Sequence, residues 1–452
     1  MEPAQIPLEV RRLAIGFTTM THIQIAALVV GLLGIGALTE LIGIQQPAQT
    51  YFDRLAKGLT RIVVIIYSAG GVLAIVFIVI LFLAVPTFWY VILRDNFWPF
   101  VLEADTFLLT TLFLFSWFFT WDRLVRFKWL HVSLGLAVFL VVWMQEAMID
   151  VVASYMLTPA PPTEWMRIFL NPTSMALNVH RLVGDFSFGG FVIAGAGAVL
   201  ALRARDPERR AYYDWVGNLG LLVGVFMLFF MPAIGIEYVL EIRLHSPGAF
   251  DTLMRGRLSW FFLLLVTYYA ILFFLGVLYM KLQAGKSGRR GQGVFRGALI
   301  LIGLSWLLLV QPYTLGPSQD HAWLNWVNPF GSMQPWKYIA FAALTLTGLY
   351  ALLAYLGTLR RGLRWGRMEQ GGRGAQWALL AVALMASGTM LWMGYIRESA
   401  RWPYTIYYQI LVSQPEQYPQ LPVTPTPAGP STGNLANDAP TSLGLDSGRP
   451  GD

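Results

Sequence analysis

Ten apolar stretches, each about 20 residues or longer, alternate along the chain with short polar connections. A helix of this length crosses the hydrocarbon core of a lipid bilayer. The pattern therefore predicts an all-α fold, a polytopic membrane helix bundle of about ten transmembrane helices. The first stretch lacks a small-residue cleavage site, so we expect it to remain as a helix rather than be removed as a signal peptide. The predicted spans are residues 13–40, 60–92, 98–120, 129–157, 178–202, 212–237, 257–280, 294–312, 336–359 and 376–397.

Two segments do not have the pattern of a span. Residues 238–256 mix charged residues such as Glu241 and Arg243 with Leu and Ile, which predicts an amphipathic helix at the membrane surface. Residues 415–452 are rich in Pro, Ser, Thr and Gly, so we expect an outer tail that is disordered or laid over a partner. The predicted membrane domain comprises residues 1–414.

Composition supports a membrane setting and limits the cofactors. Hydrophobic residues make up 56% of the chain and charged residues 13%, whereas soluble domains have about 25% charged residues. The chain has no cysteine, which excludes disulfides, thiolate metal sites and covalent c-type haem attachment. A metal cofactor would have to be held by His, Met, Glu or Asp.

The basic residues predict an orientation. Twenty of the 32 Lys and Arg residues fall in the odd-numbered connections between spans, which places those connections in the cytoplasm. Both termini then lie outside, and we expect a multi-pass protein of the cell inner (cytoplasmic) membrane. The net charge of +7 is explained by this bias and needs no nucleic-acid partner.

Two histidines, His22 and His180, lie inside predicted spans, and both fall in the outer half of the membrane. An imidazole in hydrocarbon is costly unless it bonds something. A hydrogen bond to a backbone carbonyl or hydroxyl and a bond to a metal cofactor explain each ring about equally well. His131, His245 and His321 lie at span edges or in connections, where a solvated side chain is the expected state.

Five sequence segments resemble subunit I of the cytochrome bd quinol oxidases. Two of them contain the histidines: Arg12-Leu13 followed by Thr19-Met20-Thr21-His22, and Leu170-Asn171-Pro172 followed by Val179-His180. The other three are Trp121-Asp122-Arg123-Leu124, Tyr155-Met156 before Pro159, and Arg397-Glu398-Ser399-Ala400-Arg401-Trp402-Pro403-Tyr404. The segments around His180 and Glu398 are the most specific.

The resemblance implies a haem protein. By position, His22, His180 and Glu398 correspond to the axial haem ligands, and Arg401 to the arginine beside the haem propionates. A haem also needs cations at the membrane edge, for which Arg12 and Arg181 are further candidates. The implied cofactor is haem b, with one to three haems and haem d possible. The implied partners are a homologous second membrane subunit and an electron donor, either quinol or a c-type cytochrome.

The chain departs from the family pattern in three places. The family's methionine ligand, in an Arg-Ile-Met run, aligns with Ile339, which cannot ligate iron. The family's pair of glutamates eight residues apart is here Glu103 and Thr111. The family's long hydrophilic quinol loop is replaced by two apolar spans, 257–280 and 294–312.

Acidic residues within the predicted spans are candidates for a proton path. Glu146 and Asp150 share one helix face by their i,i+4 spacing, and the same spacing allows Arg181 to pair with Asp185. A proton path through Glu103 and Glu146 and a set of structural salt bridges explain these acids equally well.

Three functions remain open at this point. The first is a haem-bearing oxidoreductase subunit that transfers electrons at the outer leaflet and reduces oxygen. The second is a non-oxidase subunit of the same type that anchors or relays electrons within a larger membrane complex. The third is a transporter, which ten spans with buried acids would suit, although the sequence shows no matching halves.

Overall fold

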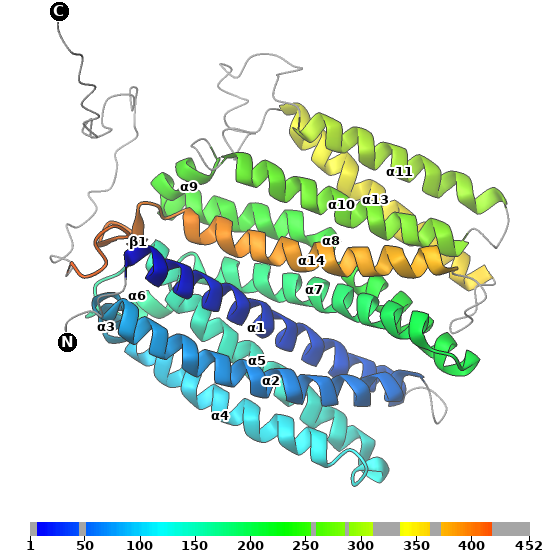
Figure 1. Ribbon diagram of the computed structural model, residues 1–452, viewed down its shortest axis with the longest axis horizontal. Coiled ribbons are helices and arrows are strands. Elements are labelled where there is room, and N and C mark those ends of the chain that lie inside the picture. The colour runs from blue at the N-terminus through cyan, green and yellow to red at the C-terminus, as the bar shows by residue number, and fades with distance from the viewer. Residues whose placement is uncertain are drawn as a thin grey trace, which may run out of the picture. The chain divides into compact units, whose positions relative to one another are not determined.

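Ten long helices lie side by side along one axis (Figure 1), which confirms the predicted all-α bundle. The computed structural model describes residues 7–44, 51–254, 259–284, 289–310, 335–361 and 372–417. Each of the ten is long and apolar enough to cross a membrane. They are α1 (Leu8–Ile44), α2 (Tyr51–Ala84), α4 (Phe97–Phe119), α5 (Lys128–Leu157), α7 (Ser174–Arg203), α8 (Pro207–His245), α10 (Ser259–Ala284), α11 (Arg289–Val310), α13 (Pro335–Arg361) and α14 (Arg373–Ser399).

The short elements divide the bundle into two recognisable ends. One end, here called the strand end, contains the start of α1 and the elements α3, α6, α9 and β1 (Figure 1). The opposite end, here called the basic end, contains the start of α2, η1 (Val125–Phe127) and the turn at residues 204–206. Strands β1 and β2 pair antiparallel, with Tyr404 opposite Leu411. The short elements at the strand end are α3 (Pro86–Asp95), α6 (Trp165–Phe169), α9 (Pro247–Met254), β1 (Tyr404–Ile406) and β2 (Ile410–Leu411).

The second predicted span, 60–92, is not one helix. α2 ends at Ala84, Val85 leaves helical geometry with φ −142° and ψ 60°, and Pro86 begins α3. Proline has no N–H to donate and restricts the residue before it, so it favours the first turn of a new helix over the interior of a long one. Hydropathy alone does not reveal this break, because the residues on both sides of it are apolar.

The predicted interfacial segment, 238–256, also differs from the structure. α8 continues without a break to His245, so the first half of the segment is the last part of the sixth spanning helix. Ser246 then ends α8, and Pro247 opens the separate helix α9. The side chains of Phe250 and Leu253 are buried in the described structure, so this short helix packs against its neighbours.

The centre of the bundle is formed by α1 and α7, the two most buried spans of the described chain. Glycines allow their close approach to neighbouring helices, as is common where membrane helices pack. A Cβ at Gly220 of α8 would lie 2.6 Å from the carbonyl oxygen of Gly190 on α7, and one at Gly31 of α1 would overlap the backbone carbonyl of Asp185. Helix α7 is therefore fixed on both sides, and with it the residues that it carries.

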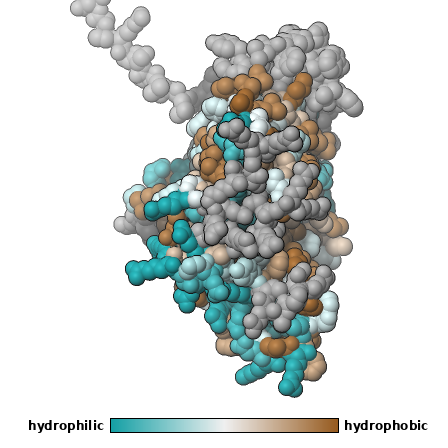
Figure 2. Space-filling model, turned by 90° about the vertical axis from the view of Figure 1, so that its right-hand side faces the viewer, coloured by the Kyte–Doolittle hydropathy of each residue, from teal (hydrophilic) through white to brown (hydrophobic). Residues whose placement is uncertain are grey.

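Both ends of the bundle carry polar side chains. Figure 2 looks onto the basic end and shows many hydrophilic side chains there. At the strand end, Arg11 donates to the carbonyl oxygen of Ala84 at 2.7 Å and pairs with Glu416 at 3.1 Å. Glu416 also accepts a hydrogen bond from Thr87 at 3.1 Å. Residues 415–417 thus pack on the bundle, and the rest of the predicted tail lies outside the described residues.

Candidate functional site

His180 lies in the first half of α7, whose start is fixed by Asn171. The side-chain Oδ1 of Asn171 accepts hydrogen bonds from the Thr173 N–H at 3.1 Å and from the Thr158 hydroxyl at 2.8 Å. The imidazole then lies beside Tyr238 of α8, with ring centroids 5.9 Å apart. Its Nδ1 atom is buried, and the described residues offer the ring no hydrogen bond.

His22 lies on α1 and faces Phe77 of α2, with ring centroids 6.3 Å apart. Its Nδ1 atom is likewise buried and without a hydrogen-bond partner among the described residues. Two residues further along α1, Gln24 donates to the backbone carbonyl of Ser387 on α14 at 2.7 Å. Helix α14 is thereby held against α1 close to this histidine.

Glu398 and Arg401 lie at the C-terminal end of α14 and form an ion pair with each other. Arg401 is 3% exposed, and its Nε–H has no hydrogen-bond acceptor within the described structure. The same is true of one Nη atom of Arg397. Tyr238, which contacts His180, lies within electrostatic range of Arg401 and Glu398, so these predicted residues belong to one region of the strand end.

The remaining predicted cations have different surroundings. Arg12 pairs with Glu9 at 3.2 Å and lies over the ring of Trp402 at 5.4 Å, close to the end of α14. Arg181 points instead to α5, where it pairs with Glu146 at 2.6 Å and with Asp150. It makes these bonds in place of the predicted ion pair with Asp185.

The two predicted proton-path acids lie on different sides of α5. Glu103 of α4 accepts a hydrogen bond from Gln145 at 3.0 Å, whereas Glu146 faces α7. The described residues include no hydrogen bond between Glu103 and Glu146. Thr111, at the place of the family's second glutamate, bonds to Tyr67 at 3.2 Å.

His131 corrects an expectation. Its side chain is not solvated: the residue is 1% exposed, and Nδ1 lies 2.5 Å from Oε1 of Glu40 on α1. Its Nε2 lies 2.9 Å from the carbonyl oxygen of Trp117, while the Trp117 indole donates to Oε2 of Glu40 at 3.0 Å. The sequence signal is a Glu, a Trp and a His, each near the same end of its span, but nothing in the sequence says that these three spans meet.

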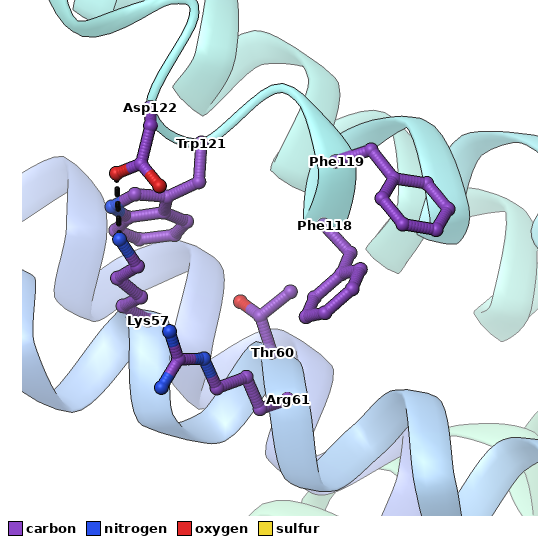
Figure 3. A pocket seen from close by; sticks show the side chains of 7 residues that line it. All are labelled: Lys57, Thr60, Arg61, Phe118, Phe119, Trp121 and Asp122. Carbon is purple, nitrogen blue, oxygen red and sulfur yellow. Dashed lines mark hydrogen bonds and ion pairs between the residues drawn. The ribbon is translucent and has the colours of Figure 1, made fainter.

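A shallow pocket of about 210 Å³ lies at the basic end, between α2 and the turn after α4 (Figure 3). Lys57 bonds to Asp122 across it at 2.6 Å, and this hydrogen bond lowers the pKa of Asp122. The ring of Trp121, in the same lining, contacts His131 with centroids 4.7 Å apart. The lining contains none of the predicted haem residues.

Three further sequence positions lie away from these residues or outside the described structure. Ile339, where the family has a methionine, lies near the start of α13 with 60% of its surface exposed. His245 is partly exposed and lies 3.4 Å from Glu241. His321 lies outside the described residues.

Comparison with known proteins identifies the family. The profile described as "Cytochrome bd terminal oxidase subunit I" matches residues 10–253, slightly more than half of the chain. The chain belongs to the cytochrome bd terminal oxidase subunit I family. Residues 10–253 hold His22, Glu103, Glu146, His180 and Arg181, whereas Glu398 and Arg401 lie outside the match.

Solved structures confirm the fold of this family member. It resembles a chain from "The structure of bd oxidase from Geobacillus thermodenitrificans", with a TM-score of 0.52 and 16% sequence identity. The likeness covers 86% of this chain and 98% of the other. A search of curated proteins found no match. At this sequence identity the similarity shows that the spans have the same arrangement, and it gives no information about individual residues.

The residues of this family member fit a haem. The two imidazoles in the spans have no hydrogen-bond partner in the described structure, so a ring nitrogen of each has a free lone pair. The unpaired, buried N–H groups of Arg397 and Arg401 are suited to carboxylates such as haem propionates. Glu398 uses one oxygen for Arg401 and keeps the other.

Proposed function

We propose that this chain is the haem-bearing subunit of a membrane oxidoreductase that takes up electrons at the outer leaflet and reduces oxygen. The observation that carries this proposal is the pair of imidazoles His22 and His180, each with a buried Nδ1 atom that has no hydrogen-bond partner in the described structure of a bd-family chain. Haem b, one to three copies, with haem d as a variant, would supply the electron transfer and oxygen chemistry when bound.

The chain's own residues would have distinct tasks in this proposal. His180, held by α7 between α5 and α8, would bind one iron, and His22 and Glu398 would bind at the oxygen-reducing haem or haems. Arg401 and Arg397 would neutralise propionates at the strand end, which the basic-residue bias predicts to be the outer side. The acids Glu103 and Glu146 would hold protons within the membrane. A homologous second subunit, and quinol or a c-type cytochrome as donor, complete the proposed assembly in the inner membrane.

A second candidate function is a relay subunit that passes electrons within a larger complex without reducing oxygen. Two observations favour it. Ile339, at the position of a family haem ligand, has a side chain that cannot bind iron and is largely exposed. Helices α10 and α11 stand where the family has its hydrophilic quinol loop.

Optical spectra of the purified complex test both proposals. We expect reduced-minus-oxidised haem bands, loss of a low-spin signal in His180→Ala, and loss of the bands sensitive to added ligands in His22→Ala. The control is His245→Ala, at a partly exposed histidine, which leaves both signals in place. Unchanged spectra in both site variants contradict the ligand assignment, and the absence of any haem band contradicts both functions and leaves the transporter.

Oxygen uptake then separates the two haem functions. Uptake driven by quinol or by a reduced c-type cytochrome supports the oxidase and names its donor. Reduction of the haem without oxygen uptake supports the relay.

A further inference from the structure

Four ionisable side chains meet in the membrane between α5 and α7, here called the α5–α7 ionic cluster. They are Glu146 and Asp150 of α5 and Arg181 and Asp185 of α7. Asp150 and Asp185 are fully buried and Glu146 is 6% exposed. The cluster thus contains three carboxyl groups and a single fixed positive charge.

The pairing within the cluster is unequal. Asp150 accepts from Arg181 and also from the Asn178 amide at 3.0 Å. Glu146 lies 2.6 Å from Arg181. The carboxyl oxygens of Glu146 and of Asp185 have no hydrogen-bond partner in the described structure, and among the described residues Asp185 also has no ion pair. Asp185 lies one helical turn beyond Arg181 on the same face of α7, and Arg181 contacts Glu146, so the Asp185 side chain is adjacent to that of Glu146 across the contact between α5 and α7.

Among the described residues, Arg181 is the cation that acts on Glu146 and Asp185. His22 of α1 lies within electrostatic range of Arg181, and Tyr238 of α8 lies within electrostatic range of Asp150. On the α4 side, Glu103 is a further carboxyl group, bonded to Gln145. If all three cluster carboxyls were ionised, the cluster would carry a net charge of −2 in a medium that solvates charge poorly.

Two adjacent carboxyl groups in such a medium do not both ionise, because like charges at close range disfavour the charged form. Two carboxylates also cannot hydrogen-bond to each other, since neither has a proton to donate. One proton between them removes a charge and supplies the missing hydrogen bond at the same time. Asp150 already accepts hydrogen bonds from Arg181 and Asn178, so its pairing needs no such proton.

We propose that Glu146 and Asp185 share one exchangeable proton and so form a proton-binding site within the membrane. The evidence for this site is the placement of Glu146 on α5 and of Asp185 on α7. Its use rests on the proposed function: Arg181 follows His180 directly in the chain, so an electron arriving beside His180 would be compensated by a proton taken up at this cluster.

Infrared spectroscopy of the purified complex tests the site. We expect a band from a protonated carboxylic acid that shifts in D₂O, and we expect the same band to be lost in Asp185→Asn and in Glu146→Gln. Loss in both follows from sharing, because removing either partner lets the other ionise beside Arg181. Asp122→Asn, at an exposed carboxylate of the basic end, is the control and keeps the band. Retention of the band in either single variant overturns the proposal.

If a variant does not fold, the infrared spectrum of the unaltered protein still tests the proposal. Absence of any exchangeable carboxylic acid band from the unaltered complex also overturns the site. A reduced-minus-oxidised infrared spectrum tests the role separately, since compensation predicts a shift of this band on reduction. If no haem signal exists but the band is present, the proposed function fails and the proton site stands.

Discussion

Two buried polar clusters share helix α5, and they differ in how completely their atoms are paired. Glu40, Trp117 and His131 form one of them at the basic end, here called the Glu40–His131 cluster. The α5–α7 ionic cluster is the other, and its Glu146 follows His131 by 15 residues, about 22 Å along a regular helix. Both lie among apolar side chains, so burial alone does not distinguish them.

Pairing does distinguish them. The Trp117 carbonyl only accepts hydrogen bonds, so Nε2 of His131 carries a proton, and one further proton lies between Nδ1 and Glu40. The Glu40–His131 cluster is then neutral overall, and both Glu40 oxygens are bonded. The α5–α7 ionic cluster has surplus carboxyl groups and an unpaired Asp185. The contrast suggests that the first cluster joins helices and the second holds a proton.

The largest expected effect is at Glu40. Glu40→Leu leaves the Trp117 indole and the His131 ring buried without their partner, so we expect the free energy of unfolding to fall by about 3–5 kcal/mol. Denaturation of the purified protein in mixed detergent micelles, followed by circular dichroism, measures this loss.

Glu40→Gln is the matched control. The glutamine carbonyl still accepts from Trp117, and its amide can donate to Nδ1 of a neutral His131. We expect a loss of no more than about 1.5 kcal/mol, the net value of an ordinary hydrogen bond. Equal losses in the two variants would show that the pairing in this cluster does not matter for stability.

A substitution at Gly31 tests how the packing of α1 against α7 supports the α5–α7 ionic cluster. Gly31→Ala places a methyl group against the backbone carbonyl of Asp185, so α1 and α7 must separate. We expect unfolding to become easier by about 1–3 kcal/mol, as for other overpacked sites. The same denaturation measurement checks this value.

Gly16 lies on the same helix, and a Cβ there would meet no atom within 4 Å. Alanine is a better helix former than glycine, so Gly16→Ala should leave stability unchanged or raise it by up to about 1 kcal/mol. Destabilisation of similar size in both variants would mean that the close approach at Gly31 has no special importance.

The sequence predicts the bundle well because each span is a local property. Length and hydropathy alone give ten helices, all present in the structure. The exact ends of helices are harder to predict from an apolar run. The break at Pro86 and the continuation of α8 to His245 each depend on a single backbone position. Hydropathy averages over such positions.

The site was predictable only in part, because partners come from other helices. Histidines within apolar spans are visible in the sequence, and the Nδ1 atoms of His22 and His180 are buried there without a hydrogen-bond partner in the described structure. Which face of α5 meets α7 is not visible, so the i,i+4 spacing allows a pair of Arg181 with Asp185, whereas the structure pairs Arg181 with Glu146 and Asp150. His131 was expected in water for the same reason, since its partner Glu40 is 91 residues away.

The smallest expected effect concerns an exposed ion pair. It tests whether pairing stabilises the fold when the paired groups are not buried. Lys57 and Asp122 lie across the pocket at the basic end (Figure 3), and their hydrogen bond lowers the pKa of Asp122 from its ordinary 3.8. The pair therefore stabilises the fold above that pH, and the gain is lost as pH falls through the lower, folded value. Asp122→Asn should melt slightly below the unaltered protein at neutral pH and together with it in strong acid. Because water and salt screen exposed charges, the gap should close in high salt; a gap that persists there would mean that pairing stabilises without burial.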